Sequence, residues 1–177
     1  TTLGASVTNN GFGASALTVN YGADGAASTM PLLYSLSVSA VGVSSGLRDT
    51  ATNQLVYLYI DSGTGDVIGL VGASGNPNPS GAEAFRIHVD ASTGSTTLTQ
   101  NRPLNHLVDG TTLADHDDVL TLAAGAVRLT AVATDRDGDS ASQTVAVGDK
   151  FSFKDDGLSL AVTGNTGSIT VDESALI

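Results

Sequence analysis

One acidic turn stands out as a stretch whose residue types and spacing could do chemistry, namely Asp135-Arg136-Asp137-Gly138-Asp139-Ser140. Its three carboxylates alternate along the chain, between two segments that are expected to be strands. Calcium takes 6 to 8 oxygen ligands at about 2.3 to 2.6 Å, and alternating Asp residues in a tight turn can direct several carboxylates and a backbone carbonyl at one ion. The spacing therefore predicts a calcium (Ca²⁺) site formed by Asp135, Asp137 and Asp139.

The turn does not match an EF-hand loop. With Asp135 at the first position, the sixth position is Ser140 where Gly is required and the twelfth is Ala146 where Glu is required. A polar hairpin turn without any metal is the alternative interpretation, because Asp and Gly are common turn residues. Three like charges with a single Arg between them would repel one another without a counterion, which favours calcium.

Three other acidic groups are weaker candidates. Asp155 and Asp156, in the turn Lys154-Asp155-Asp156-Gly157, are the second choice for metal ligands, although adjacent carboxylates are usually a solvated turn. The cluster at 115–118 suits a helix cap or a solvated loop better than a metal site. Asp172 and Glu173 would lie at a junction in a tandem array, and would be solvated at a chain end.

The remaining residues do not indicate an enzyme. His88, His106 and His116 lack metal-ligand spacing, and the sequence has no Gly-x-Ser-x-Gly elbow, phosphate loop or dinucleotide fingerprint. The absence of Cys removes disulfides, zinc-thiolate sites and thiol catalysis. Tyr57 and Tyr59 share one strand face and could form a small sugar-stacking platform, although flanking core aromatics explain them better. We expect no catalytic residues, and the alternative function is a carbohydrate- or surface-polymer-binding module.

The elements that must position these residues are short strands. Apolar and small polar residues alternate along most of the chain, as in strands with one buried face. About ten strands are expected, around 17–21, 34–40, 55–60, 67–71, 85–89, 96–100, 127–133, 144–147, 151–153, 158–162 and 169–171. The strands at 85–89 and 96–100 form one predicted hairpin, and those at 127–133 and 144–147 form another that carries the acidic turn. Residues 72–81 are a predicted loop, 119–122 suit a strand or a short helix, and the whole pattern predicts an all-β sandwich or barrel.

Length and charge limit the classes of partner. The 177 residues are the size of one domain, so 1–177 is predicted to be a single unit, with about 164–177 as a junction to a neighbouring one. The chain has 16 Asp and 2 Glu against 7 basic residues, a formal net charge of −11. Nucleic acids and anionic membrane surfaces bind proteins through clustered Lys and Arg, which this acidic chain lacks. No apolar run approaches the ~20 residues that a membrane span needs. We therefore expect no nucleic acid partner, no membrane insertion, and a monomer as the isolated unit.

Four segments, 19–26, 42–47, 131–142 and 151–157, together resemble motifs of a known family. The most specific is the Asp-x-Asp-Gly-Asp-Ser turn followed about fifteen residues later by Lys-Asp-Asp-Gly. The chain resembles, from about residue 17 to 171, the tandem repeat (extender) domain of giant RTX adhesins, which the type I secretion system exports. The end at 171–174 resembles the start of a following repeat.

This resemblance implies a calcium-dependent antiparallel β-sandwich, immunoglobulin-like in general architecture, that extends a secreted bacterial surface adhesin. It implies neighbouring repeats of the same chain as partners, a place outside the cell on a Gram-negative surface, and a role in adhesion and biofilm formation. The calcium ligands would be Asp135, Asp137 and Asp139, with Asp155 and Asp156 as further candidates. Leu158 stands where the family usually has Pro, and the Gly-Gly-x-Gly-x-Asp repeats are absent, so no calcium β-roll is expected.

Overall fold

The computed structural model describes residues 5–9, 18–106 and 118–154, and these residues form eleven strands and no α-helix. Among these same residues a short 3-10 turn, η2 (Gly148–Lys150), precedes strand β11. The strands are β1 (Ala5–Asn9), β2 (Leu32–Val38), β3 (Val43–Arg48), β4 (Leu55–Ile60), β5 (Val67–Val71), β6 (Glu83–Val89), β7 (Thr96–Gln100), β8 (Val119–Thr121), β9 (Val127–Thr134), β10 (Ser140–Ala146) and β11 (Ser152–Lys154).

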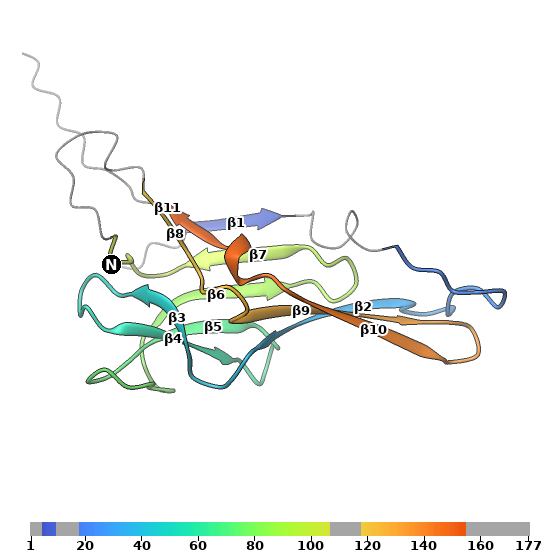
Figure 1. The fold of residues 1–177 in the computed structure, drawn as a ribbon, viewed down its shortest axis with the longest axis horizontal. Coiled ribbons are helices and arrows are strands. Elements are labelled where there is room, and N and C mark those ends of the chain that lie inside the picture. Colours follow the sequence, from blue (N-terminus) through green and yellow to red (C-terminus); the bar gives the residue numbers. More distant parts are fainter. Residues whose placement is uncertain (1–4, 10–17, 107–117, 155–177) are drawn as a thin grey trace, which may run out of the picture.

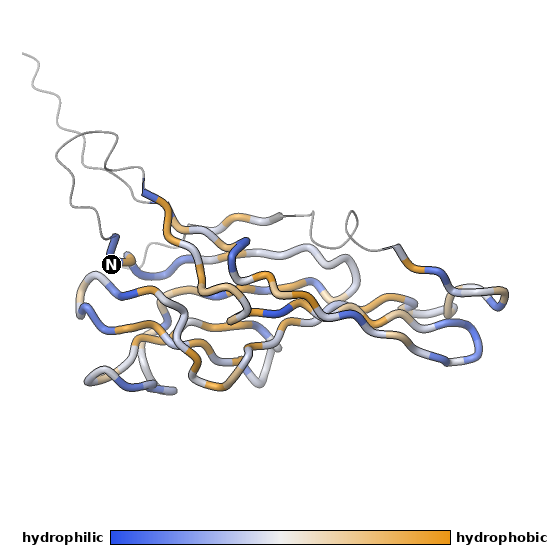
Figure 2. The backbone as a smooth tube through the Cα atoms, viewed as in Figure 1, coloured by the Kyte–Doolittle hydropathy of each residue, from blue (hydrophilic) through white to orange (hydrophobic). Residues whose placement is uncertain are grey.

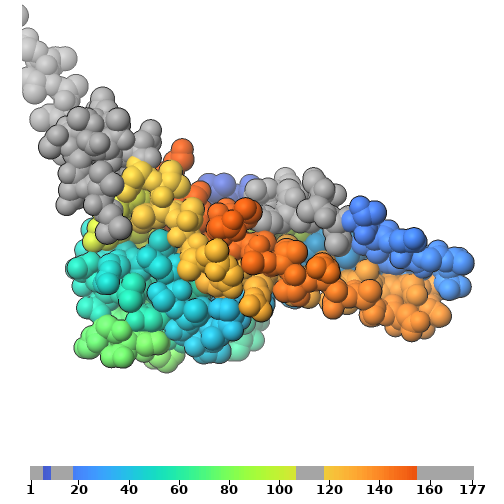
Figure 3. All heavy atoms as spheres, in the orientation of Figure 1, coloured from blue at the N-terminus to red at the C-terminus, as the bar shows by residue number. Residues whose placement is uncertain are grey.

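Every strand pair in the described part of the chain is antiparallel, and these pairs make three sheets. The largest sheet has the order β1-β7-β6-β5-β4-β3, the second has the order β10-β9-β2, and β11 pairs with β8 in a two-stranded ribbon. The β9–β10 hairpin and the segment before β2 extend beyond the six-stranded sheet at one end of the molecule (Figure 1). The same end is a narrow projection in the space-filling view (Figure 3).

The main core lies between the six-stranded sheet and the other two sheets. One contiguous cluster joins fully buried Phe85 and Leu58 of the large sheet to Val127 of β9 and Phe153 of β11. The Phe85 and Phe153 rings are tilted by 52° with centroids 5.1 Å apart, a favourable aromatic geometry. The apolar residues follow the strands of the body, whereas the β9–β10 turn is hydrophilic (Figure 2). The protein is therefore an antiparallel β-sandwich.

A second apolar cluster lies on the opposite face of the six-stranded sheet. Tyr57 and Tyr59 of β4 pack there with Leu70 of β5, and the two tyrosines are only 7% and 9% exposed. The hydroxyl of Tyr57 donates a hydrogen bond of 2.7 Å to the Gly75 carbonyl, which ties the loop at 72–81 to this face. Because the rings are buried, they offer no exposed platform for stacking a sugar.

Most of the predicted strands are confirmed. The structure has both predicted hairpins, β6–β7 and β9–β10, and the predicted loop at 72–81 contains no strand. The strand expected at 17–21 is wrong for residues 18–21, which lie outside any strand. Residues 119–121 are a strand, and the strands expected at 158–162 and 169–171 lie outside the described residues. Strands β1 and β3 were not predicted, because β1 offers only Ala5 and Val7 as apolar residues and β3 has polar Ser45 between Val43 and Leu47.

Candidate metal centre

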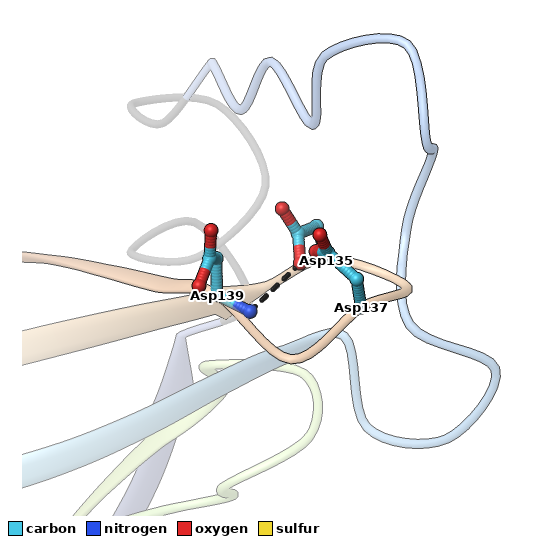
Figure 4. A group of neighbouring side chains, drawn as sticks. All are labelled: Asp135, Asp137 and Asp139. Carbon is cyan, nitrogen blue, oxygen red and sulfur yellow. Dashed lines mark hydrogen bonds between the residues drawn. The ribbon is translucent and has the colours of Figure 1, made fainter.

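The three alternating carboxylates of the sequence come together in the turn between β9 and β10. Asp135, Asp137 and Asp139 each offer a carboxylate oxygen, and these oxygens all lie within 4.8 Å of one another. Asp135 is half-buried, whereas the other two side chains are exposed at the projecting end of the molecule. Figure 4 shows the three side chains along one turn, with Asp135 and Asp137 close together.

Asp135 builds the turn that carries the other two. Its carboxylate oxygen Oδ1 accepts hydrogen bonds from the backbone N–H of Gly138 at 3.1 Å and of Asp139 at 2.9 Å. Its own N–H donates to the Asp139 carbonyl at 3.0 Å. Gly138 has φ +97°, a backbone conformation that glycine adopts without steric cost. One oxygen of Asp135 is thus committed to the turn itself.

A second segment, distant in sequence, clasps this turn. The N–H of Arg136 donates to the Gly25 carbonyl at 3.0 Å, and the N–H of Ala27 donates to the Thr134 carbonyl at 3.1 Å. Ala26 and Asp135 form an isolated antiparallel bridge. We call these contacts the tip clasp. They bring together two of the four segments on which the resemblance was based, a juxtaposition that spacing within one segment could not predict.

The carboxyl groups of the turn perturb one another. A hydrogen bond with Asp135, followed by the negative charge of Asp135, raises the pKa of Asp137 above its usual range. The hydrogen bond from Asp137 lowers the pKa of Asp135, and the backbone N–H groups of Asp139 and Gly138 add to that decrease. The pair therefore shares a proton on acidification, as expected of two carboxylates held at short range.

The donor set fits a hard cation. All three candidate ligands are carboxylate oxygens, which suit Ca²⁺ or Mg²⁺ and do not suit metals that prefer nitrogen or sulfur. Two oxygens that each lie about 2.4 Å from one ion are at most about 4.8 Å apart, which the cluster satisfies. The turn could thus hold a metal ion, and the geometry does not select calcium over other hard cations.

A cavity of about 530 Å³ opens beside the cluster, between the segment 18–22 and the strands β9 and β10. Its lining includes small side chains of both strands and Tyr21 of the segment 18–22. Asp135 and Asp139 also line it, so two of the three carboxylates are shared by the cavity and the candidate metal centre.

The structure does not test the other predicted ligands, because they lie beyond the residues it describes. Asp155 and Asp156 lie outside the described residues, as do Asp115, Asp117, His116, Asp172 and Glu173. Asp118 is described, and its carboxylate is 2.5 Å from Nδ1 of His106, so this group pairs with a histidine. Nδ1 of His88 lies 2.7 Å from a carboxylate oxygen of Asp66.

Two ion-pair groups that sequence reasoning did not single out stabilise the sheets. Asp49 is fully buried and accepts from Nε of Arg102 at 2.7 Å and from the Thr52 hydroxyl at 2.7 Å. Burial would raise the pKa of Asp49, but these hydrogen bonds outweigh it and leave that pKa below its usual value. Arg86 pairs with three carboxylates at 2.8 to 2.9 Å, those of Asp61, Asp66 and Glu83. Asp49 lies 53 residues from Arg102, and Asp61 and Asp66 lie 25 and 20 residues from Arg86, so no local signal indicated these ion pairs. Glu83 is the exception, three residues before Arg86 on the same strand.

Fold and turn together define an all-β sandwich module with a carboxylate cluster at one tip. The chain belongs to the protein family described as "Domain of unknown function (DUF5801)", whose model matches residues 2–148. Comparison with curated proteins and with solved structures gave no match. In the part of the chain that the structure describes, no helix is long and apolar enough to span a membrane.

Proposed function

We propose that this protein is a calcium-binding structural extender module of a secreted bacterial surface adhesin, with no enzymatic activity. The observation that carries the proposal is the convergence of Asp135, Asp137 and Asp139 within 4.8 Å at the projecting tip. The resemblance of the sequence to repeats of type I-secreted RTX adhesins supports the adhesin context. In that context the partners are neighbouring repeats of one chain, and the module serves adhesion and biofilm formation at the surface of a Gram-negative cell.

The role of the residues is electrostatic. Without a cation, the ionised carboxylates of the turn repel one another, as the raised pKa of Asp137 indicates. A bound calcium ion supplies positive charge that offsets this repulsion. Because the tip clasp joins the turn to the segment at 25–27, ordering the turn also orders that segment. Calcium is scarce inside cells, so the same module is less rigid before export than after it.

Calcium binding is expected to add to folding stability by mass action. A ligand that binds only the folded state adds about 2.7 kcal/mol at 100 times its Kd. We therefore expect excess chelator to lower the Tm of the protein and added calcium to restore it, measured by calorimetry. Titration with magnesium in parallel tests which hard cation the turn prefers. An unchanged melting curve in chelator and in calcium would contradict the proposal.

The double variant Asp137→Ala with Asp139→Ala tests the assignment of the ligands. It removes two exposed carboxylates and keeps the Asp135 carboxylate, which accepts the backbone N–H groups of Gly138 and Asp139 and so builds the turn. We expect weaker calcium binding by calorimetric titration and nearly unchanged stability in excess chelator. Asp24→Ala, an exposed acidic residue outside the cluster, is the matched control and should bind calcium normally.

The second candidate function is a carbohydrate- or surface-polymer-binding module, which the cavity beside the turn favours. Tyr21 and Gln143 both line this cavity and together offer an aromatic surface and an amide. A glycan array separates the two candidates. Reproducible binding that is lost in Tyr21→Ala supports the binding module, and silence across the array together with a calcium-dependent Tm supports the extender.

A further inference from the structure

Strand β1 is attached to the sandwich through the edge of the six-stranded sheet. It pairs with β7 in continuous antiparallel register, from Ala5 opposite Gln100 to Asn9 opposite Thr96. Its central side chains, Ser6, Val7 and Thr8, are all exposed, and Val7 is 71% exposed. None of these three belongs to either apolar cluster. Main-chain pairing, more than burial, therefore attaches β1 to β7.

The side-chain contacts between the two strands are hydroxyl pairs. The Thr8 and Thr97 hydroxyls are 2.8 Å apart, and the Thr99 hydroxyl donates to that of Ser6 at 3.4 Å. Contacts of this kind depend on the register of the two strands, and any β1 segment that adopts this register makes them equally well. A sheet edge from which the outer strand has detached is a ready template for pairing with a strand from another chain.

We propose that the β7 edge is a strand-accepting site whose second occupant is the β1 strand of another copy of this chain. The exchanged pair makes the same main-chain bonds and hydroxyl contacts as the internal one, so the exchange costs no contact between these strands. Eight residues, 10–17, separate β1 from the rest of the described chain, and they include Gly11 and Gly13. Exchange of an identical element in this way is a low-cost route to dimers.

The length of the linker between β1 and the rest of the chain sets the protein concentration at which strand exchange between copies competes with the internal β1–β7 pair. A strand tethered through a linker of this length stands at an effective concentration of about 1 mM, so the internal pair prevails in dilute protein. The isolated protein is therefore a monomer at micromolar concentration, and exchanged dimers accumulate when it refolds near millimolar concentration. This inference does not depend on the metal centre and goes beyond the proposed function.

The absence of Cys makes the exchange directly measurable. Two single variants, Thr8→Cys and Thr97→Cys, carry tags of different mass and are unfolded together, refolded and oxidised. We run the mixture at about 1 mM and at about 10 µM, on either side of the effective concentration of the linker. A disulfide-linked heterodimer on a non-reducing gel is expected at the higher concentration, and its yield should fall steeply on dilution.

Two controls make the result decisive. One chain carrying both Thr8→Cys and Thr97→Cys should close its disulfide as a monomer when dilute, which checks the register. The mixture of Val41→Cys with Thr97→Cys measures random collision, because Val41 is 81% exposed and lies outside β1. If the first mixture gives no more heterodimer than this control while the doubly substituted chain closes, the proposal is overturned.

A second pair of positions provides the same test if a substitution at the first pair disturbs folding. Ser6→Cys and Thr99→Cys face each other in the same register and are tested in the same way if either threonine variant loses its folded spectrum. Heterodimer at this pair supports exchange, and its absence together with monomer closure overturns it.

Discussion

The two tyrosines of β4 differ in one hydrogen bond. The Tyr57 hydroxyl donates to the Gly75 carbonyl at 2.7 Å, whereas the buried Tyr59 hydroxyl has no hydrogen-bond partner among the described residues. Burial, and then the neighbouring Tyr57, raise the pKa of Tyr59, so it stays protonated. A buried polar group without a partner carries its full desolvation cost, which is about 1 to 3 kcal/mol.

This difference predicts opposite effects of the same substitution. Tyr59→Phe removes an unpaired polar atom and should leave the free energy of unfolding unchanged or raise it by about 1 kcal/mol. Tyr57→Phe breaks a hydrogen bond and should lower that free energy by about 1 kcal/mol. Urea unfolding of the two variants measures both values. Equal losses in the two would show that the Tyr59 hydroxyl has a partner in solution.

At the scale of single elements, β5 depends on a glycine. A Cβ atom at Gly69 would lie 2.5 Å from the ring of Phe85 on the paired strand β6, a distance that real Cβ atoms do not show. The large ring of Phe85 thus occupies the space that a side chain on β5 would need.

We expect Gly69→Ala to destabilise the protein by about 1 to 3 kcal/mol through overpacking of the core. Gly63→Ala is the control, because its Cβ would meet only Asp61 Oδ1 at 3.4 Å. Adding Phe85→Leu to Gly69→Ala should cost less than the sum of the two single changes, since the smaller side chain relieves the clash. Additive losses in denaturant unfolding would contradict this explanation.

Local alternation predicted many of the strands and failed in two identifiable ways. Residues 18–21 alternate as a strand would, but the Tyr21 hydroxyl donates to the Pro31 carbonyl and the segment lines a cavity without pairing. An alternation of apolar and polar residues indicates only that one side of a segment is buried. A segment that lies against a sheet without pairing to it shows the same alternation. Strand β3 was missed because Ser45 is polar and yet fully buried, its hydroxyl donating to the Val56 carbonyl at 2.7 Å.

The same reasoning separates the predictable part of the candidate site from the rest. The spacing of Asp135, Asp137 and Asp139 is local, so the sequence indicated that these carboxylates converge. The tip clasp and the buried pair of Asp49 with Arg102 join residues that are far apart in the chain, and only the tertiary fold brings them together. The excess of Asp also has a structural use, since Asp90 accepts four hydrogen bonds within its own turn.

For the whole molecule, paired carboxylates set the response to acid. Hydrogen bonds from Arg86 lower the pKa of Asp61. Burial would raise the pKa of Asp66, but hydrogen bonds from His88 and Arg86 outweigh it and leave the pKa low. The pKa of buried Asp49 is also low. A carboxyl whose folded pKa is depressed contributes stability above its unfolded pKa, near 3.9, and loses it as the pH falls through the folded value.

We therefore expect the metal-free protein to lose stability steeply below about pH 4, measured by urea unfolding from pH 7 to pH 2.5. Asp137 acts in the opposite sense: its folded pKa is raised, so its contribution is present in acid and lost as the pH rises through that value. It is an exposed group, and the depressed pKa values of Asp49, Asp61 and Asp66 act in the other direction. Asp49→Asn should be less stable at pH 7 and should show a shallower acid slope. A slope equal to that of the unsubstituted protein would exclude Asp49 as a contributor.

Strand β4 is covered on both faces, by the main core on one side and by the tyrosine cluster on the other, so four consecutive residues, 56–59, are buried. Water reaches the amides of such a strand only after both coverings have opened. Amide exchange through this part of the sheet is consequently governed by cooperative opening, whereas an edge strand such as β10, exposed along its length, can exchange by local fraying.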